Sequence, residues 1–213
     1  SLRYMSSGAA FSPDGRWIAF AAQTGGRDAL YLYDVERQRV ERRLRFELNG
    51  IANPTWSPDG RNVAFSGLDG GLSDIYVTDL DGNLRRLTDD RFADLMPAWS
   101  PDGRHIAFTT DRGGETDFEE LAYGNMRVAL FDLASGAVRA LPHQDGGKNV
   151  NPVWSPDGRS LIWVGDRTGT NDLYLFDLER QSLERITDVL SGIIAVTPLS
   201  PVLSWAASGR LAF

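Results

Sequence analysis

A ten-residue stretch, Trp56-Ser57-Pro58-Asp59-Gly60-Arg61-Asn62-Val63-Ala64-Phe65, recurs almost unchanged along this chain. Three further copies begin at Phe11, Trp99 and Trp154. Self-similarity at a regular spacing indicates one supersecondary unit that is built several times and stacked on itself. The fold must therefore be a repeat architecture, and we expect function in the segments that differ between copies.

The repeated stretch has the chemistry of a hairpin corner. Pro58 presets the backbone for the first bend, Asp59 bonds its own backbone, and Gly60 accepts the positive φ where the chain reverses. An aromatic residue precedes the corner and an apolar-Ala-aromatic triplet follows it. This pattern predicts two antiparallel strands joined at the corner.

The spacing between corners predicts the kind of repeat. The intervals from Ser12 to Ser57, to Ser100 and to Ser155 are 45, 43 and 55 residues. A period in the forties with four strand signals is typical of a β-propeller blade. Because the third interval is longer than the others, we expect an insertion within it.

We therefore predict an all-β fold, a single-domain β-propeller over residues 1–213 with four complete four-stranded blades and a partial fifth. The expected blades are about 8–46, 52–88, 95–142 and 149–187, with the partial blade over 196–213. Residues 1–5 are expected to form the outer strand of a preceding or last blade. In the partial blade, residues 201–204 are aligned with residues 54–57, followed by a turn one residue longer. Such a ring does not close, so we expect an excerpt of a larger propeller.

Composition excludes several classes of function. The net charge of −7 and the pI of 4.9 argue against a nucleic-acid groove, which needs clustered Lys and Arg. The chain has no cysteine, so it has no disulfide or thiolate site. No apolar run is long enough to predict direct membrane insertion. Open propeller edges would expose apolar faces, which makes a homodimer through these edges one expected arrangement.

The unit Pro-x-Trp-Ser-Pro-Asp-Gly-Arg-x-Ile-Ala-Phe, with Asp-Arg-Gly-Gly from Asp111 and Asp-Arg-Thr-Gly from Asp166, resembles the TolB-type propeller repeat. This WD40-like repeat also occurs in the tricorn protease and in propellers attached to prolyl-oligopeptidase-like peptidases. The resemblance covers nearly the whole chain. It implies a bacterial protein of the periplasm or cell envelope that binds a protein or peptide partner.

The candidate binding surface is the propeller face that carries the loops between second and third strands and the loops between blades. The long loop of residues 111–125 has five carboxylates against one arginine, with Phe118 and Tyr123 between them. Such a loop suits a basic or amphipathic partner segment. The alternative is a solvated insertion without a role. The candidate binding residues are Asp90, Arg91, Phe92, Asp94, Asp111, Arg112, Glu115, Asp117, Phe118, Tyr123, Asp166 and Arg167.

No metal site, cofactor or catalytic residue is predicted. The oxygen-rich segment of residues 89–94 lacks the spacing of a calcium loop, and Arg91 would compete for its carboxylates. There is no Gly-x-Ser-x-Gly elbow, and His105 and His143 have no evident nucleophile to activate. The repeated aspartates, such as Asp59, are best explained as turn residues.

Three functions follow from these features. The first is a non-catalytic scaffold that binds a protein or peptide through its loop face and central channel. The second is a propeller that accompanies a peptidase in a larger protein and gates or recruits its peptide substrate. The third and weaker function is a propeller that binds or processes carbohydrate.

Overall fold

The computed structural model describes residues 4–113, 115–188, 192–193, 203–206 and 208–213 of this protein. Its secondary structure consists of strands and turns, which form four four-stranded antiparallel sheets and one two-stranded hairpin. In this described part no helix is long and apolar enough to cross a membrane. The predicted all-β propeller fold with four complete blades and a partial fifth is confirmed.

Each blade is one sheet whose strands follow their order in the sequence. Blade 1 comprises β1 (Tyr4–Phe11), β2 (Trp17–Thr24), β3 (Arg27–Asp34) and β4 (Arg39–Leu44). Blade 2 comprises β5 (Gly50–Trp56), β6 (Asn62–Asp69), β7 (Leu72–Asp79) and β8 (Leu84–Arg86). Blade 3 comprises β9 (Asp94–Trp99), β10 (His105–Thr110), β11 (Arg127–Asp132) and β12 (Val138–Ala140). Blade 4 comprises β13 (Asn149–Trp154), β14 (Ser160–Gly165), β15 (Asp172–Asp177) and β16 (Ser182–Arg185), and partial blade 5 comprises β17 (Ser204–Trp205) and β18 (Leu211–Ala212).

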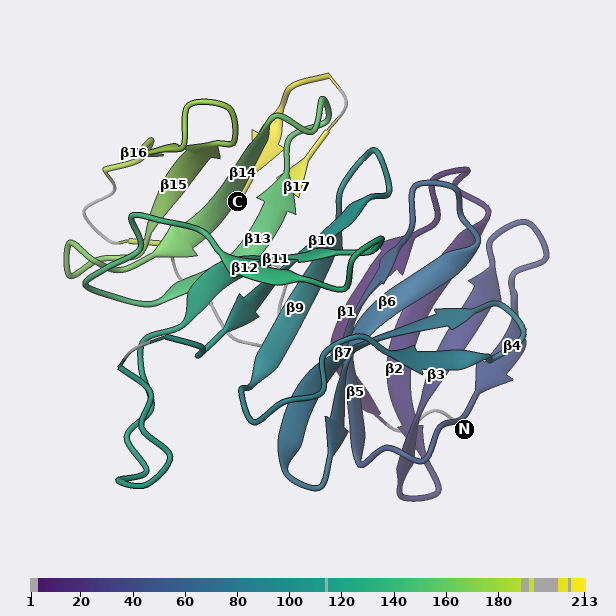
Figure 1. Ribbon diagram of the computed structural model, residues 1–213. Helices are drawn as coiled ribbons and strands as arrows, with labels where there is room; N and C mark the ends of the chain where they lie inside the picture. Colours follow the sequence, from purple (N-terminus) through teal and green to yellow (C-terminus); the bar gives the residue numbers. More distant parts are fainter. Residues whose placement is uncertain (1–3, 114, 189–191, 194–202, 207) are drawn as a thin grey trace.

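The first strands of consecutive blades contact one another and form the middle of the molecule. Figure 1 shows β1, β5, β9 and β13 there, with the outer strands β4 and β16 at the periphery. The expected insertion is the long connection between β10 and β11, which projects away from the blades (Figure 1).

Every corner of the repeat is held by the same local hydrogen bonds. In blade 2 the Ser57 hydroxyl donates to Asp59 Oδ1 at 2.6 Å, and the Gly60 amide donates to the Ser57 carbonyl at 2.9 Å. Gly60 has a φ of 69°, which a residue with a Cβ adopts only at a cost. The Ser57 hydrogen bond, together with the Arg61 amide, lowers the pKa of Asp59 below its ordinary value. The aspartates of the motif are thus turn residues, as the sequence indicates.

The hydrophobic core lies between the blades. Along β6, Val63 and Phe65 pack with blade 1, whereas Ala64 packs with Ile106 and Phe108 of blade 3. This alternation follows from the two-residue period of a strand, which sends successive side chains to opposite faces of the sheet. Each complete blade is therefore a layer with two apolar faces, and the fold is stabilised by stacking these layers.

Two details of the predicted organisation are wrong. Tyr4 and Met5 belong to β1, where they pair with Gln23 and Ala22, so they are not part of an outer strand. Strand β1 begins before residue 8, the expected start of the blade. Its pairing with β2 continues beyond a bulge between Met5 and Ala9.

The register of the partial blade also differs from the expected one. Trp205 pairs with Leu211 as Trp56 pairs with Val63, and the Gly209 amide donates to the Ala206 carbonyl as Gly60 does to Ser57. The Ala206 amide reaches the Arg210 carbonyl, one residue nearer than in blade 2. The turn is therefore one residue shorter, and Trp205 occupies the position of Trp56. Residues 194–202 lie outside the described part of the chain.

Candidate functional site

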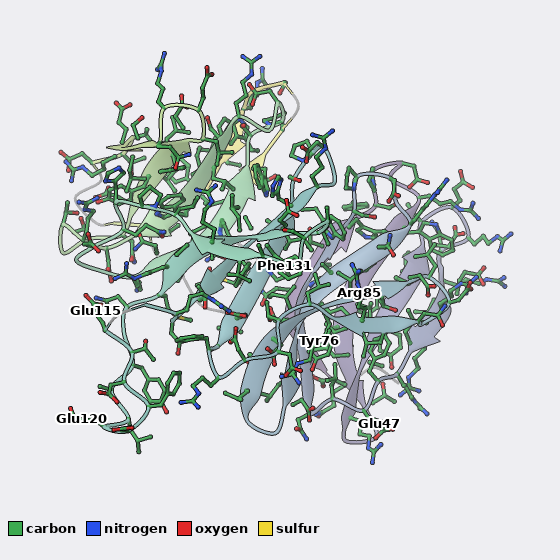
Figure 2. All side chains as sticks on the ribbon, viewed as in Figure 1. Glu47, Tyr76, Arg85, Glu115, Glu120 and Phe131 are labelled. Atoms are coloured by element: carbon green, nitrogen blue, oxygen red, sulfur yellow. The ribbon has the colours of Figure 1, made fainter. Side chains whose placement is uncertain are left out.

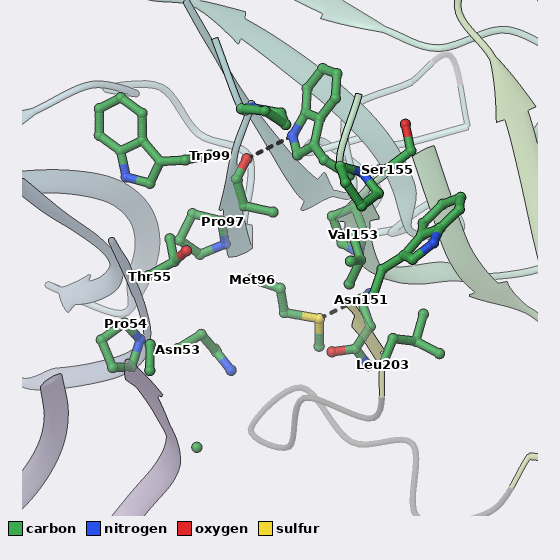
Figure 3. A pocket seen from close by; sticks show the side chains of 18 of the residues that line it. Asn53, Pro54, Thr55, Met96, Pro97, Trp99, Asn151, Val153, Ser155 and Leu203 are labelled. Atoms are coloured by element: carbon green, nitrogen blue, oxygen red, sulfur yellow. Dashed lines mark hydrogen bonds between the residues drawn. The ribbon is translucent and has the colours of Figure 1, made fainter. Parts of the chain in front are cut away.

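The inner strands enclose a cavity of about 500 Å³ in the central channel. Asn53 of β5, Met96 of β9 and Asn151 of β13 occupy equivalent positions around it, each directly before a proline. Figure 3 shows these three side chains reaching toward the same space. Prolines and tryptophans of the same strands form part of the remaining wall, which also includes residues of β1 and of the partial blade.

These three channel residues have an unfavourable backbone conformation. Asn53, Met96 and Asn151 have φ values of 53°, 54° and 58°, although the residue before proline normally avoids the helical regions. The Asn151 amide donates to Met96 Sδ at 3.3 Å, and Asn151 Nδ2 is buried without an acceptor among the described residues. Backbone strain and an unpaired amide in one cavity are typical of ligand sites.

The channel residues Asn53, Met96 and Asn151 are not among the candidate binding residues predicted from the sequence. The available signal was the Asn-Pro or Met-Pro pair that precedes each Trp-Ser-Pro-Asp-Gly motif in blades 2 to 4. Only the structure brings these pairs together, because they come from blades more than forty residues apart.

On the loop face, Arg112 joins several of the predicted site residues. Its guanidinium forms ion pairs with Asp90 at 2.9 Å and with Asp94 at 2.7 Å. The same group lies over the Phe92 ring, 5.1 Å from its centroid. Arg112, and not Arg91 as expected, therefore neutralises the carboxylates of this oxygen-rich segment. Arg91 lies over the ring of Phe118 instead.

Asp94 is fully buried at the start of β9. Burial raises the pKa of Asp94 to about 6, against the opposing effect of the Arg112 guanidinium. Blade 2 has Ile51 at this position and blade 4 has Asn149, so the ion pair is particular to blade 3. The Asp94–Arg112 pair thus fixes the segment before β9 to the start of the long β10–β11 loop.

The long loop is anchored at its middle and exposed at its tip. Phe118 packs edge-on against Phe92, with ring centroids 5.3 Å apart. Leu121 and Tyr123 are 69% and 65% exposed. Figure 2 shows Glu115 and Glu120 on this projecting loop. The loop therefore presents exposed apolar side chains in a segment that also has the exposed carboxylates of Glu115, Asp117, Glu119 and Glu120.

Two of the predicted acidic residues have structural roles. Asp111 is buried and accepts a hydrogen bond from the Ala93 amide at 2.8 Å. Asp117 accepts from the amides of Glu119 and Glu120 and so closes the turn at the loop tip. Asp117 remains exposed, whereas Asp111 does not face solvent.

Asp166 and Arg167 occupy in blade 4 the positions of Asp111 and Arg112 in blade 3. Asp166 accepts from the Lys148 amide at 2.8 Å, and Arg167 donates to the His143 carbonyl and lies over the Tyr174 ring. They form a second cluster in blade 4, apart from the one around Arg112. The structure therefore divides the twelve predicted residues between two blades.

Arg127 is a further charged residue that sequence analysis missed. It occupies the position at which blades 2 and 4 have Asp74 and Asp172, and these two carboxylates pair with Arg86 and Arg185. Arg127 instead contacts Glu115 at 3.8 Å and Asp145 at 3.5 Å. Because an arginine replaces the aspartate at this position, Arg127 links the base of the long loop to the loop between blades 3 and 4.

Several solved structures share this propeller architecture. A structure from Agrobacterium tumefaciens assigned to TolB is 26% identical with a TM-score of 0.70, covering 87% of this chain and 63% of that one. TolB from Acinetobacter baumannii is 26% identical with a TM-score of 0.68, covering 85% of this chain and 43% of that one. A puromycin-hydrolyzing peptidase of Mycobacterium tuberculosis, 17% identical with a TM-score of 0.69 over 99% of this chain and 34% of that one, shares the fold.

Sequence comparisons agree with this result. An uncharacterized protein of Agrobacterium fabrum is 33% identical over 81 residues, which are 36% of this chain and 27% of that protein. This chain spans less than two thirds of the length of each of these relatives. The model of the family described as the TolB beta propeller domain matches residues 1–118, more than half of the chain. With the four stacked blades, this match means that the chain belongs to the TolB beta propeller domain family.

Proposed function

We propose that this chain is a non-catalytic interaction module that binds a basic, amphipathic protein segment through its loop face and channel. The observation that carries the proposal is the tip of the β10–β11 loop. There Leu121 and Tyr123 are mostly exposed, and they directly follow Asp117, Glu119 and Glu120 in the sequence. Exposed aromatic and aliphatic side chains become anchors when a partner covers them, and the carboxylates favour a basic partner.

The anchoring of the loop supports the same function. The Phe118–Phe92 contact and the ion pairs of Arg112 hold the loop base against blade 3. A loop that is already ordered loses less conformational entropy when it binds. The exposed tip can therefore bind a partner with a small loss of conformational entropy.

The channel is a second proposed binding region, which reaches from the middle of the inner strands to Pro101 and Pro156 at the hairpin corners. Its cavity of about 500 Å³ has apolar walls with the amides of Asn53 and Asn151 among them. Mostly apolar cavities with a few polar groups are typical of sites that receive a side chain or a chain end. We propose that part of the partner segment enters this cavity. We also propose that this protein is located in the periplasm or cell envelope.

The test is a selection from a random peptide library displayed on phage, with the purified chain as the target. We expect enrichment of sequences that combine Lys or Arg with aromatic residues. Affinities of synthetic versions are then measured by fluorescence anisotropy at two salt concentrations. Binding should weaken as salt increases, because the loop carboxylates are exposed and screened.

A double substitution, Leu121→Ser with Tyr123→Ser, should weaken binding at least about tenfold, since two hydrophobic anchors are lost. The matched control is Val40→Ser on β4, which removes an exposed apolar side chain of blade 1 and should leave binding unchanged. Equal affinity of all three proteins would exclude the loop tip from the binding surface.

A further inference from the structure

Two of the junctions between blades are closed by a matching pair of hydrogen bonds. Between blades 1 and 2, Trp56 Nε1 donates to the Ala10 carbonyl at 3.0 Å, and Arg42 donates to the Leu80 carbonyl at 2.9 Å. Arg42 also forms an ion pair with Asp81 at 2.8 Å. An indole and a guanidinium thus connect the two sheets.

The junction between blades 3 and 4 repeats this arrangement. Trp154 Nε1 donates to the Ala98 carbonyl at 3.0 Å. Arg139 donates to Gln181 Oε1 at 3.5 Å, at the corresponding turn of blade 4. Arg42 and Arg139 are equivalent, because they pair with Leu32 and Leu130 at the same register of their sheets.

The junction between blades 2 and 3 lacks both hydrogen bonds. Trp99 Nε1 is buried and has no acceptor among the described residues. Arg85 pairs with Val77 and so corresponds to Arg42, but its side chain forms no hydrogen bond or ion pair with the described residues. In blade 3, Ala134 occupies the position of Asp81, so Arg85 has no carboxylate there with which to form an ion pair.

A pocket of about 490 Å³ opens at this junction. Its apolar wall is formed by Trp99, Val77 and Leu133, and Arg85 lies at its outer side (Figure 2 marks Arg85). The corner aspartates Asp59 and Asp102 also line it. The pocket is at the end of the blades that carries the hairpin corners, opposite the loop face.

The pocket is lined by the carboxylates of Asp59, Asp79 and Asp102, and both oxygens of Asp79 accept hydrogen bonds from Asn83. Burial opposes ionisation of Asp102, but the hydrogen bonds from Ser100 and Arg104 outweigh it and lower the pKa of this carboxyl. The Ser57 hydroxyl lowers the pKa of Asp59 in the same way. Asp59 and Asp102 use Oδ1 in their own corner, at 2.6 Å from Ser57 and Ser100 respectively, and Asp102 Oδ2 lies 4.0 Å from the exposed Arg104 Nε. Arg85 forms no ion pair with either of them.

We propose that this pocket binds a small zwitterion, an α-amino acid or dipeptide with an apolar side chain. The ligand carboxylate pairs with the Arg85 guanidinium, and its ammonium group lies at Asp59 and Asp102. Its side chain packs against Trp99 and Leu133. A purely anionic ligand would meet the three aspartates of the lining and a purely cationic one would meet Arg85, so only a ligand with both charges satisfies both walls. This site lies at the end of the blades opposite the loop face, and it shares Trp99 with the wall of the channel cavity.

The experiment is a titration of the purified chain with leucine, phenylalanine and their dipeptides, followed by calorimetry and saturation-transfer NMR. We expect at least one of these ligands to bind with a Kd of about 1 mM or tighter. Acetylation of its amine or amidation of its carboxylate should weaken binding at least about tenfold, because each removes one ion pair. Absence of binding, or equal binding of the blocked forms, would overturn the proposal.

Three variants locate the site. Arg85→Gln should weaken binding at least about tenfold, whereas Arg42→Gln, at the same register of blade 1, should leave it unchanged. Ala134→Asp supplies the missing carboxylate, so Arg85 should pair with it and binding should be lost. Both arginines are largely exposed, so the first two variants test binding without loss of the fold. Equal weakening by Arg42→Gln and Arg85→Gln would exclude this pocket.

Discussion

Trp154 of blade 4 donates an indole hydrogen bond to the carbonyl oxygen of Ala98 in blade 3, at 3.0 Å. The first strand of one blade is thereby tied to the first strand of the next. The same bond joins Trp56 to Ala10, but Trp99 does not form it. The repeated tryptophan is therefore both a core residue and, at two of these three junctions, a connection between sheets.

The first prediction concerns this bond. Trp154→Phe should reduce the free energy of unfolding by about 1–3 kcal/mol more than Trp99→Phe, because only the former leaves a carbonyl without its donor. Chemical denaturation followed by circular dichroism measures both values. Equal losses in the two variants would mean that the hydrogen bond contributes nothing.

The second prediction concerns the stacking of hairpin corners. Gly103 has a φ of 71°, and a Cβ built on it would lie 3.3 Å from Pro58 Cγ of the preceding blade. Gly15 has a φ of 70° with nothing within 4 Å. Both glycine-to-alanine variants should lose about 1–2 kcal/mol from the left-handed backbone, with an additional loss for Gly103→Ala. Equal melting temperatures for the two variants would contradict close packing of the corners.

The third prediction concerns Asp94. Its pKa in the folded protein is raised to about 6 from 3.8, so the folded state holds this proton more tightly than the unfolded state. The contribution of the protonated carboxyl to stability is present below about pH 4 and is lost as the pH rises through about 6. Relative to Asp94→Asn, the wild-type protein should lose on the order of 2 kcal/mol across this range. A difference that stays constant from pH 4 to 7 would show an unshifted carboxyl.

The fourth prediction concerns the anchoring of the long loop. Phe118→Ala removes the contact with Phe92, which should free the loop and increase its rate of cleavage by a protease that cuts after acidic residues. Tyr123→Ala is the control, since Tyr123 is 65% exposed and removal of its ring should leave the cleavage rate unchanged. Mass spectrometry of the fragments identifies cuts between residues 115 and 121. Similar cleavage of both variants would argue against the anchor.

Local chemistry explains which features the sequence predicts well. The hydrogen bonds of a corner join residues at most five positions apart, such as Ser57 and Asn62, so the motif specifies its own turn. The predicted register was wrong in the partial blade, where residues of the motif are replaced. The partial blade has Ala206 and Ser208 in place of Ser and Asp, and its register was recognised only from its pairing.

The candidate site was predicted less completely for a related reason. Composition identified the long acidic loop, and the structure brings Asp90, Asp94 and Arg112 together as an ion-paired cluster. Composition did not indicate that Phe118 is an internal anchor while Tyr123 remains exposed. Both are aromatic residues in an acidic segment, and only their three-dimensional neighbours distinguish them.

The sequence by itself determined the repeat, its corners and the number of blades, because these depend on turn residues and on the two-residue period of strands. Only the tertiary structure decided which groups meet between blades. Whether Arg85 has a partner depends on residue 134 of another sheet, and whether Asn151 faces Met96 depends on how two inner strands stack. These contacts join residues about fifty positions apart, so they follow from the stacking of blades and from no local pattern.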